Sequence, residues 1–315
     1  MSLREIAKAQ FFELHRLSPT VSAWGFAPMA GRKGLKLAID RDYVDVRQGA
    51  KVIRLSHRHQ FYLPDLIRDF DYYFSAVEPI CLGGVELVDY STPRYHDVIG
   101  FPLHPVIFPS LAEPLSTTSQ YLDFGELSVG DVVLDLGAYS GLTSILFDQI
   151  VGPSGKVIAV DADLENIKYI RKNVRLYGGV TGRTIEVEHG AVWENDGELE
   201  FSSEGSMGSS AASIVGRERG ALSKVSCFTL TSLAERHNLD RVDFIKCDVE
   251  GAEAVIFEQP RFFARFRPRI IMEVHPVDGR LTTEACRQTL SGFGYECRQI
   301  DQPGSNLPLL ECVPA

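Results

Sequence analysis

The stretch Val132-Val133-Leu134-Asp135-Leu136-Gly137-Ala138-Tyr139-Ser140-Gly141 decides the fold of this chain of 315 residues. Residues 132–136 are almost entirely apolar, which is typical of a strand that a parallel sheet buries on both faces. Gly137 and Gly141 follow at the predicted junction between this strand and a helix. Gly137 would let a ligand approach the backbone, and Gly141 would let the helix pack closely on the strand. In doubly wound α/β folds, such a junction binds nucleotides.

The residues after this stretch alternate between predicted helices and strands, which indicates a mostly parallel sheet with helices on both faces. The predicted helices are 140–150, 164–177, one from 252 and 283–290, and the predicted strands are 156–162, 184–192, 198–203, 224–230, 242–249, 269–276, 295–300 and 308–313. The last two strands would form an antiparallel pair after five parallel strands. This ending predicts the methyltransferase variant of the doubly wound, Rossmann-like α/β fold.

Residues 1–118 lack this alternation and are predicted to form a smaller α+β domain, separate from the doubly wound domain at 119–315. The segment 34–56 predicts two or three short strands that turn at 41–42 and 48–49. An amphipathic helix is expected after Pro64, followed by a strand at 83–93. Four prolines between 102 and 114 then interrupt a connecting segment.

Composition limits the function further. The formal net charge is −10 and the mean hydropathy is −0.03, so a nucleic-acid partner is not expected, because phosphate binding needs clustered cations. No stretch is apolar enough for a signal peptide or a spanning helix, which predicts a cytoplasmic protein with no membrane partner. The cysteines show no metal-ligand spacing and are expected to be small buried thiols; they are Cys81, Cys227, Cys247, Cys286, Cys297 and Cys312.

The junction after the first strand predicts the charge of its ligand. Asp135 suits a cationic group, such as the amino group of a methionine moiety, and would repel a pyrophosphate. The dinucleotide fingerprint G-x-G-x-x-G is absent, because Ala138 and Tyr139 separate Gly137 from Ser140. We therefore predict that residues 135, 137–139 and 141 bind S-adenosylmethionine.

The ends of the next two strands complete the predicted cofactor site. Asp161, followed by Ala162, ends the second strand, where a carboxylate can accept hydrogen bonds from both ribose hydroxyls. An aspartate at a strand end can instead cap a helix, and Asp163 is the alternative for that role. Ala191 and Val192 are predicted to end the third strand and to hold the adenine ring.

A second informative segment ends the fourth strand. On an extended strand Lys246, Asp248 and Glu250 share a face, which predicts either a compensated ion-pair network or a working site. His275, at the end of the next strand, could lie beside Asp248 and act as a general base. Asp248, Glu250 and His275 could also bind a divalent metal, but no tight ligand spacing supports this, and no metal is predicted.

These motifs carry a resemblance to a known family. The run IKCDVEGAE at 245–253 is similar to the IKIDVEGAE signature of FkbM-type methyltransferases, and residues 134–138 fit that family's first motif. Residues 229–244 resemble its TLDxL element and short helix, so the resemblance covers about residues 120–280. The departures are Asp161 for the more usual Glu, Cys247 for an aliphatic residue and Thr231 for Asp.

The resemblance implies methyl transfer from S-adenosylmethionine, usually to a hydroxyl oxygen of a sugar, polyol or other small molecule. N-methylation, an NAD-dependent oxidoreductase and a non-catalytic binding protein remain alternatives. The Gly- and Ser-rich segment 203–216 is expected to be a mobile lid or only a crossover. The N-terminal domain is expected to shape the acceptor pocket or to form a homodimer, and the sequence does not choose between them.

Overall fold

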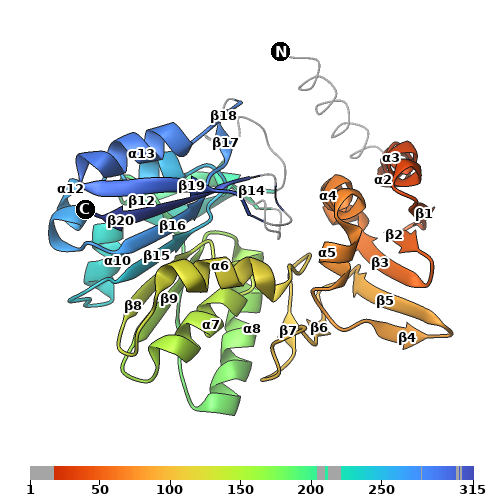
Figure 1. The fold of residues 1–315 in the computed structure, drawn as a ribbon, viewed down its shortest axis with the longest axis horizontal. Coiled ribbons are helices and arrows are strands. Elements are labelled where there is room, and N and C mark those ends of the chain that lie inside the picture. The colour runs from red at the N-terminus through yellow and green to blue at the C-terminus, as the bar shows by residue number, and fades with distance from the viewer. Residues whose placement is uncertain (1–17, 204–209, 212–220, 278, 303–304, 306) are drawn as a thin grey trace. The chain divides into compact units, whose positions relative to one another are not determined.

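The computed structural model describes residues 18–203, 210–211, 221–277, 279–302, 305 and 307–315. The chain divides into two compact units, Met1–Leu115 and Ser116–Ala315 (Figure 1). This division lies three residues before the boundary expected from sequence, and the functions expected of the two parts stay predictions. None of the helices in the described ranges combines the length and the apolar character needed to cross a membrane.

The N-terminal unit contains a five-stranded sheet in the order β1-β2-β3-β5-β4. Its elements are α2 (Pro19–Trp24), α3 (Ala27–Arg32), β1 (Lys36–Ile39), β2 (Tyr43–Gln48), β3 (Lys51–Ser56), the 3₁₀ helix η1 (His57–Tyr62), α4 (Leu63–Arg68), α5 (Phe70–Phe74), β4 (Ile80–Leu82), β5 (Val85–Tyr90), β6 (Tyr95–His96) and β7 (Val106–Ile107). The predicted strands and their turns are confirmed. The helix predicted after Pro64 is present but is not continuous, because Asp69 leaves helical geometry and separates α4 from α5.

The C-terminal unit is built on a seven-stranded sheet in the order β10-β9-β8-β15-β16-β20-β19. Its strands are β8 (Val132–Leu136), β9 (Lys156–Asp161), β10 (Glu186–His189), β15 (Phe244–Cys247), β16 (Arg269–Glu273), β19 (Tyr295–Ile300) and β20 (Leu309–Pro314). Within this sheet only β20 runs against the other strands. The predicted mostly parallel sheet with an antiparallel end is confirmed.

Helices cover both faces of this sheet (Figure 1). They are α6 (Leu115–Gly125), α7 (Leu142–Val151), α8 (Leu164–Thr181), α10 (Leu230–Arg236), α11 (Glu253–Ile256), α12 (Pro260–Arg265) and α13 (Thr283–Gly292). Leu134, Leu136, Ile245 and Cys247 belong to the same buried cluster as the apolar residues of α10, α12 and α13. Because side chains alternate along a strand, Asp135 and Lys246 point to the opposite face, which α6–α8 cover.

A smaller four-stranded sheet, in the order β11-β14-β12-β13, adjoins the large one. Its strands are β11 (Ala191–Val192), β12 (Gly197–Ser203), β13 (Ser210–Ala211) and β14 (Ala221–Phe228), and the strands predicted at 198–203 and 224–230 correspond to the antiparallel pair β12 and β14. The single strand predicted at 184–192 is wrong, because the chain changes sheets at Gly190. The predicted lid lies mostly outside the described residues.

The cysteine prediction is also corrected. Cys297 and Cys312 face each other on the antiparallel strands β19 and β20 and form a disulfide, with their Cα atoms 4.1 Å apart. Cys227, Cys247 and Cys286 are buried thiols as expected, whereas the fourth free cysteine, Cys81, is exposed. The sequence spacing alone gave no sign of this pair, because it depends on the register of two strands.

Candidate active site

The candidate site lies at the C-terminal ends of β8, β9, β15 and β16. Strand β8 has β9 on one side and β15 on the other, so the chain reverses its direction of winding between β8 and β15. In open α/β sheets, ligands bind outside the strand ends at this switch point. The register pairs Asp135 with Lys246, which brings the two predicted motifs together.

Gly137 allows β8 and β15 to approach closely where both strands end. Its φ is +76°, a conformation that favours glycine, and a Cβ atom built there would lie 1.7 Å from the backbone oxygen of Asp248. The amide of Asp248 also donates a hydrogen bond to the carbonyl of Leu136. Gly137 therefore allows a close contact between two strand ends. The sequence analysis expected this glycine only to let a ligand approach the backbone.

Gly141 has a related role at the start of α7. It precedes the helix with φ +77°, and a Cβ atom there would lie 3.1 Å from Cγ2 of Ile170 in α8. Its small size thus permits packing between two helices, whereas the sequence interpretation placed the contact between helix and strand. Tyr139, between the two glycines, has a φ of +52°, and Ala138 is buried.

Asp135 and Lys246 form a buried ion pair. The Lys246 Nζ atom lies 3.3 Å from Asp135 Oδ1 and donates a 2.7 Å hydrogen bond to the carbonyl of Gly137. Ser144 donates a hydrogen bond to the other oxygen of Asp135. Burial alone would lower the pKa of Lys246, but the charges of Asp135 and Asp248 outweigh it and raise this pKa, so the ammonium stays charged.

This pairing changes the predicted role of Asp135. The side chain is fully buried, and a neighbour faces each of its oxygens. Direct contact with a methionine ammonium would require Lys246 or Ser144 to move. The geometry instead gives Asp135 the task of holding Lys246, which in turn holds the backbone of Gly137.

Asp161 lies at the end of β9, as predicted. Its carboxylate accepts 2.8 Å hydrogen bonds from the backbone amides of Tyr139 and Asp163, and Asn166 contributes longer ones. Burial raises the pKa of Asp161 to about 7. Asp163 caps α8 by accepting a hydrogen bond from the amide of Glu165, so Asp161 is not the helix cap. Ala162 joins the two aspartates.

The third strand does not end where the sequence predicted, and the adenine contact expected at Ala191 and Val192 stays a prediction. β10 ends at His189, and Ala191 and Val192 form β11 of the smaller sheet. Val192 is buried, whereas Ala191 is partly exposed. The chain leaves the large sheet at Gly190, where a side chain would not fit because a Cβ atom would lie 2.5 Å from the ring of Phe228.

Asp248 and Glu250 follow β15 in a turn. The strand ends at Cys247, and Glu250 has a φ of +54°, so the prediction that Lys246, Asp248 and Glu250 share one face of an extended strand is wrong. The Asp248 side chain is 31% exposed, with Oδ2 3.9 Å from Lys246 Nζ. Its protein surroundings and the charge of Glu273 raise the pKa of Asp248 to about 6, although Lys246 and His275 act in the other direction.

His275 lies beside Asp248, as expected. Its Nε2 atom is 3.7 Å from Oδ1 of Asp248, 3.7 Å from Oε1 of Glu250 and 3.5 Å from Oε2 of Glu273. Burial alone would lower the pKa of His275, but Glu250, together with Glu253 and Glu273, outweighs this effect and raises the pKa well above its usual value. In the structure shown, His275 is therefore poorly suited to be a free general base.

Two acidic residues of this cluster were not singled out from the sequence. Glu253, fully buried at the start of α11, accepts hydrogen bonds from Nδ1 of His275 at 2.7 Å and from the amide of Gly251 at 3.0 Å. Glu273 ends β16, two residues before His275. Its place at the end of a parallel strand was the one available signal, because that is where such folds do chemistry.

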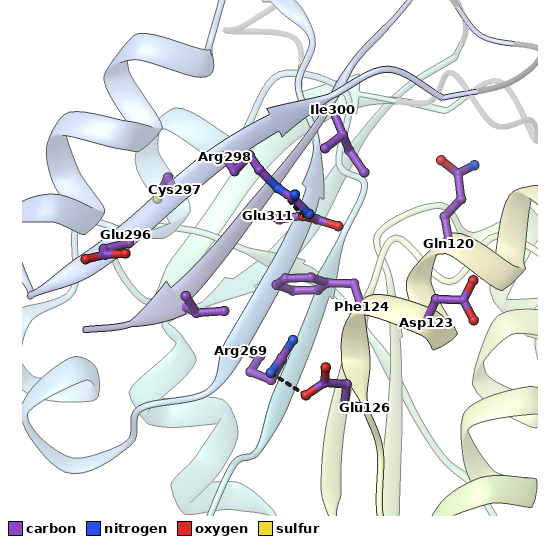
Figure 2. Close-up of a pocket in the computed structure, with 11 residues that line it drawn as sticks. Gln120, Asp123, Phe124, Glu126, Arg269, Glu296, Cys297, Arg298, Ile300 and Glu311 are labelled. Atoms are coloured by element: carbon purple, nitrogen blue, oxygen red, sulfur yellow. Dashed lines mark hydrogen bonds and ion pairs between the residues drawn. The ribbon is translucent and has the colours of Figure 1, made fainter.

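A pocket of about 670 Å³ occurs elsewhere in the C-terminal unit. Figure 2 shows Phe124 of α6 in this pocket, near the ion pair between Arg269 and Glu126. Arg269 is the first residue of β16, whereas the candidate site lies at the opposite end of that strand. None of the predicted site residues lines the pocket, so it is distinct from the candidate site.

Comparisons with known proteins assign the chain to a family. The family model described as the methyltransferase FkbM domain matches residues 135–297, which is more than half of the chain. The match begins at Asp135, the residue before the last one of β8, and includes the turn after β15 and His275. No curated protein sequence matches the chain.

Solved structures with low sequence identity are also similar. The methyltransferase FkbM from Methylobacillus flagellatus is 14% identical with a TM-score of 0.42, over 62% of this chain and 50% of that one, so the chain spans half the length of that protein. A precorrin-6y C5,15-methyltransferase from Geobacter metallireducens is 15% identical with a TM-score of 0.41, over 64% and 88%. An O-methyltransferase from Bacillus cereus, in complex with SAH, is 12% identical with a TM-score of 0.39, over 65% and 82%.

Proposed function

Because the chain belongs to the FkbM methyltransferase family and is thus an S-adenosylmethionine-dependent methyltransferase, we propose that it methylates a hydroxyl oxygen of a small polar acceptor. A sugar, a polyol or a small secondary metabolite is the acceptor class. The observation that carries this proposal is the group of carboxylates at the ends of β15 and β16, with the partly exposed Asp248 among them. An oxygen nucleophile must lose a proton, and this group can receive it.

The acidic character of the site fits the cofactor. Asp161, Asp248 and Glu250 lie at or beside the strand ends, a set that favours a ligand with sulfonium and ammonium charges and would repel a pyrophosphate, whereas the charge of Asp135 is already paired with Lys246. This charge argues against the alternative of an NAD-dependent oxidoreductase. S-adenosylmethionine supplies a methyl group on sulfur, which is transferred by in-line displacement.

Each part of the cofactor has a proposed partner. Asp161 accepts hydrogen bonds from the ribose hydroxyls, while the amides of Tyr139 and Asp163 keep its carboxylate at the end of β9. The backbone of residues 137–139 contacts the methionine part. Ala191 and Val192, which follow the end of β10, keep their proposed contact with the adenine ring.

The acceptor hydroxyl is proposed to lie against Asp248 and Glu250. A carboxylate whose pKa is raised to about 6 is still mostly ionised at neutral pH, and it holds a proton better than an ordinary aspartate. The hydroxyl proton passes to one of these two carboxylates as the oxygen forms its bond to the methyl carbon. His275 lies 3.7 Å from each of these carboxylates and positions them.

Two measurements test the proposal. Calorimetric titration with S-adenosylmethionine, with NAD as control, should show selective binding that Asp161→Ala abolishes or strongly weakens. A panel of sugars, polyols and matched amines is then screened for S-adenosylhomocysteine release. Release with hydroxyl acceptors is expected, and release with amines alone would overturn the proposed O-methylation.

A variant pair tests the proton acceptor. Asp248→Asn should lower kcat by about 10²–10⁴-fold, the usual contribution of general acid–base catalysis, with little change in cofactor affinity. Asp243→Asn is the matched control, because Asp243 precedes the same strand at its opposite end. Equal kcat values for the two variants would refute the role of Asp248.

A further inference from the structure

One buried histidine nitrogen at the candidate site faces only carboxylates. His275 is 4% exposed, and among the described residues its Nε2 atom has no hydrogen-bond partner. Oxygens of Asp248 and Glu273 lie 3.7 Å and 3.5 Å from this nitrogen. One ligand atom from each of these three residues lies within 4.8 Å of the others. From this arrangement we propose that Asp248, Glu273 and His275 bind a divalent cation.

The hydrogen bond on the other side of the ring prepares His275 as a ligand. Its Nδ1 atom lies 2.7 Å from Oε1 of Glu253. Glu253 is held in turn by the amide of Gly251 and the hydroxyl of Thr282. A carboxylate on one imidazole nitrogen takes the N–H hydrogen bond and leaves the lone pair of the other nitrogen for a metal, an arrangement found behind most metal-binding histidines.

The two carboxylates are oriented in the same way. Oε1 of Glu273 accepts hydrogen bonds from Gln302 and Ser305, which leaves Oε2 facing His275. Oδ2 of Asp248 faces Lys246, and Oδ1 faces His275. Each proposed ligand therefore has one atom held by the protein and a second atom directed to the same point.

The separations suit ligands of one ion. Two ligands in tetrahedral coordination, each about 2.1 Å from the ion, lie about 3.4 Å from each other. The distances from Nε2 to the two carboxylates, 3.5 Å and 3.7 Å, are close to this value. Small side-chain movements would complete the coordination, and the exposed side of Asp248 leaves room for a further ligand.

The charge balance also favours a divalent ion. Four carboxylates, those of Asp248, Glu250, Glu253 and Glu273, lie within 4 Å of the His275 ring nitrogens. A proton on His275 supplies one positive charge against this set and Lys246, 3.9 Å from Asp248, supplies another, whereas a divalent cation in place of the proton raises the total from two to three. Uncompensated charge in a buried site is costly, so the doubly charged occupant leaves less of it.

The ligand set indicates which cations bind. Imidazole suits Zn²⁺ and other first-row transition metals, whereas carboxylate and water oxygens suit Mg²⁺, Ca²⁺ and Mn²⁺. One nitrogen and two carboxylate oxygens therefore favour Mn²⁺, Co²⁺ or Zn²⁺ over Mg²⁺. If the proposed O-methylation holds, on which this step rests, the cation would bind the acceptor oxygen and acidify its hydroxyl, with the proton passing to Glu250.

The test measures binding of the metal alone to the full chain. MnCl₂ and CoCl₂ are titrated by calorimetry after chelator treatment, with MgCl₂ for comparison, and the visible absorption of bound Co²⁺ is recorded. We expect one Mn²⁺ or Co²⁺ per chain. His275→Gln and Glu273→Gln should each weaken binding at least tenfold and remove the Co²⁺ absorption. Circular dichroism checks that each variant is folded.

A second histidine–carboxylate pair supplies the matched control. Nε2 of His237 lies 2.9 Å from Oε1 of Glu188 in the same unit, outside the proposed site. His237→Gln should bind Mn²⁺ as the unchanged protein does. A loss equal to that of His275→Gln, or no stoichiometric binding of Mn²⁺ and Co²⁺ by folded protein, would overturn the cation site.

S-adenosylmethionine titration of the same samples separates the two proposals. Cofactor binding and hydroxyl methylation without metal binding would overturn only the cation site. Metal binding with no methylation of any hydroxyl acceptor would support the cation site while overturning the proposed function.

Discussion

Gly137→Ala should be among the most damaging single substitutions in the C-terminal unit. Two effects add at this position. An alanine at a φ of +76° costs about 1–2 kcal/mol, because its Cβ crowds the carbonyl oxygen in left-handed geometry. The new atom would also lie 1.7 Å from the Asp248 carbonyl, and overpacking of this kind costs about 1–3 kcal/mol. We expect a total loss of about 2–5 kcal/mol in the free energy of unfolding.

Two other glycines separate the effects. Gly182, at the end of α8, has a φ of +73° with nothing within 4 Å of a built Cβ, so Gly182→Ala measures the backbone cost alone. Gly141 has a φ of +77°, and its built Cβ meets only the Ile170 side chain, at 3.1 Å, which can shift. The expected order of destabilisation is Gly137→Ala, then Gly141→Ala, then Gly182→Ala.

The assay is urea unfolding followed by tryptophan fluorescence. The chain has two tryptophans, and Trp193 packs against the core of the C-terminal unit. A Trp24→Phe background removes the signal of the N-terminal unit, so the remaining fluorescence reports the unit under test. If Gly137→Ala cost no more than Gly182→Ala, the close approach of β8 and β15 would not be the reason for this glycine.

Three further predictions concern charge and covalent bonding. Because burial raises the pKa of Asp161 to about 7 and ribose hydroxyls donate to its ionised form, S-adenosylmethionine affinity should fall about tenfold per pH unit below 7. Calorimetry from pH 5 to 8 should show this slope, and its persistence in Asp161→Asn would contradict the assignment. Lys246→Met should lower the free energy of unfolding, measured with urea, by about 3–5 kcal/mol, because it leaves the charge of Asp135 buried and unpaired. Adding Asp135→Asn to this variant should restore part of the lost stability. The Cys297→Ser/Cys312→Ser double variant should lose about 3 kcal/mol, as expected for a bridge across 15 residues; equal stability of oxidised and reduced protein would argue against a stabilising bridge.

The sequence predicted those parts of the fold that depend on local pattern. A parallel strand buried on both faces must be a continuous apolar run, and residues 132–136 satisfy that condition without reference to the rest of the chain. The antiparallel ending could also be predicted from local sequence, because the last two strands follow each other at the end of the chain. Gly190 shows the limit of local pattern, because the need for glycine there depends on the ring of Phe228, which lies 38 residues further along the chain.

The positions of the candidate site residues could be predicted from the sequence, but their contacts could not. The place of Asp248 and His275 followed from strand ends, since the carboxyl ends of neighbouring parallel strands meet at one edge. The residues that contact Asp248 and His275 could not be predicted from the strand ends. Glu253 reaches the His275 ring from the start of a helix 22 residues earlier, and Glu273 is turned toward it by Gln302 and Ser305. Such contacts depend on how three separate elements pack, which periodicity does not encode.

The cofactor side and the acceptor side of the site depend on one packing constraint. Lys246 donates to the Gly137 carbonyl, pairs with Asp135 and lies 3.9 Å from Asp248, so one buried ammonium connects the end of β8 to the turn after β15. The absence of a side chain at Gly137 allows that turn to approach. Moving the Asp248 carbonyl away would therefore shift both the backbone proposed to hold the methionine part and the carboxylate proposed to receive the proton. This connection explains why damage at Gly137 should appear as weaker cofactor binding and as lower kcat together, whereas Asp161 and Asp248 variants should each affect mainly one of them.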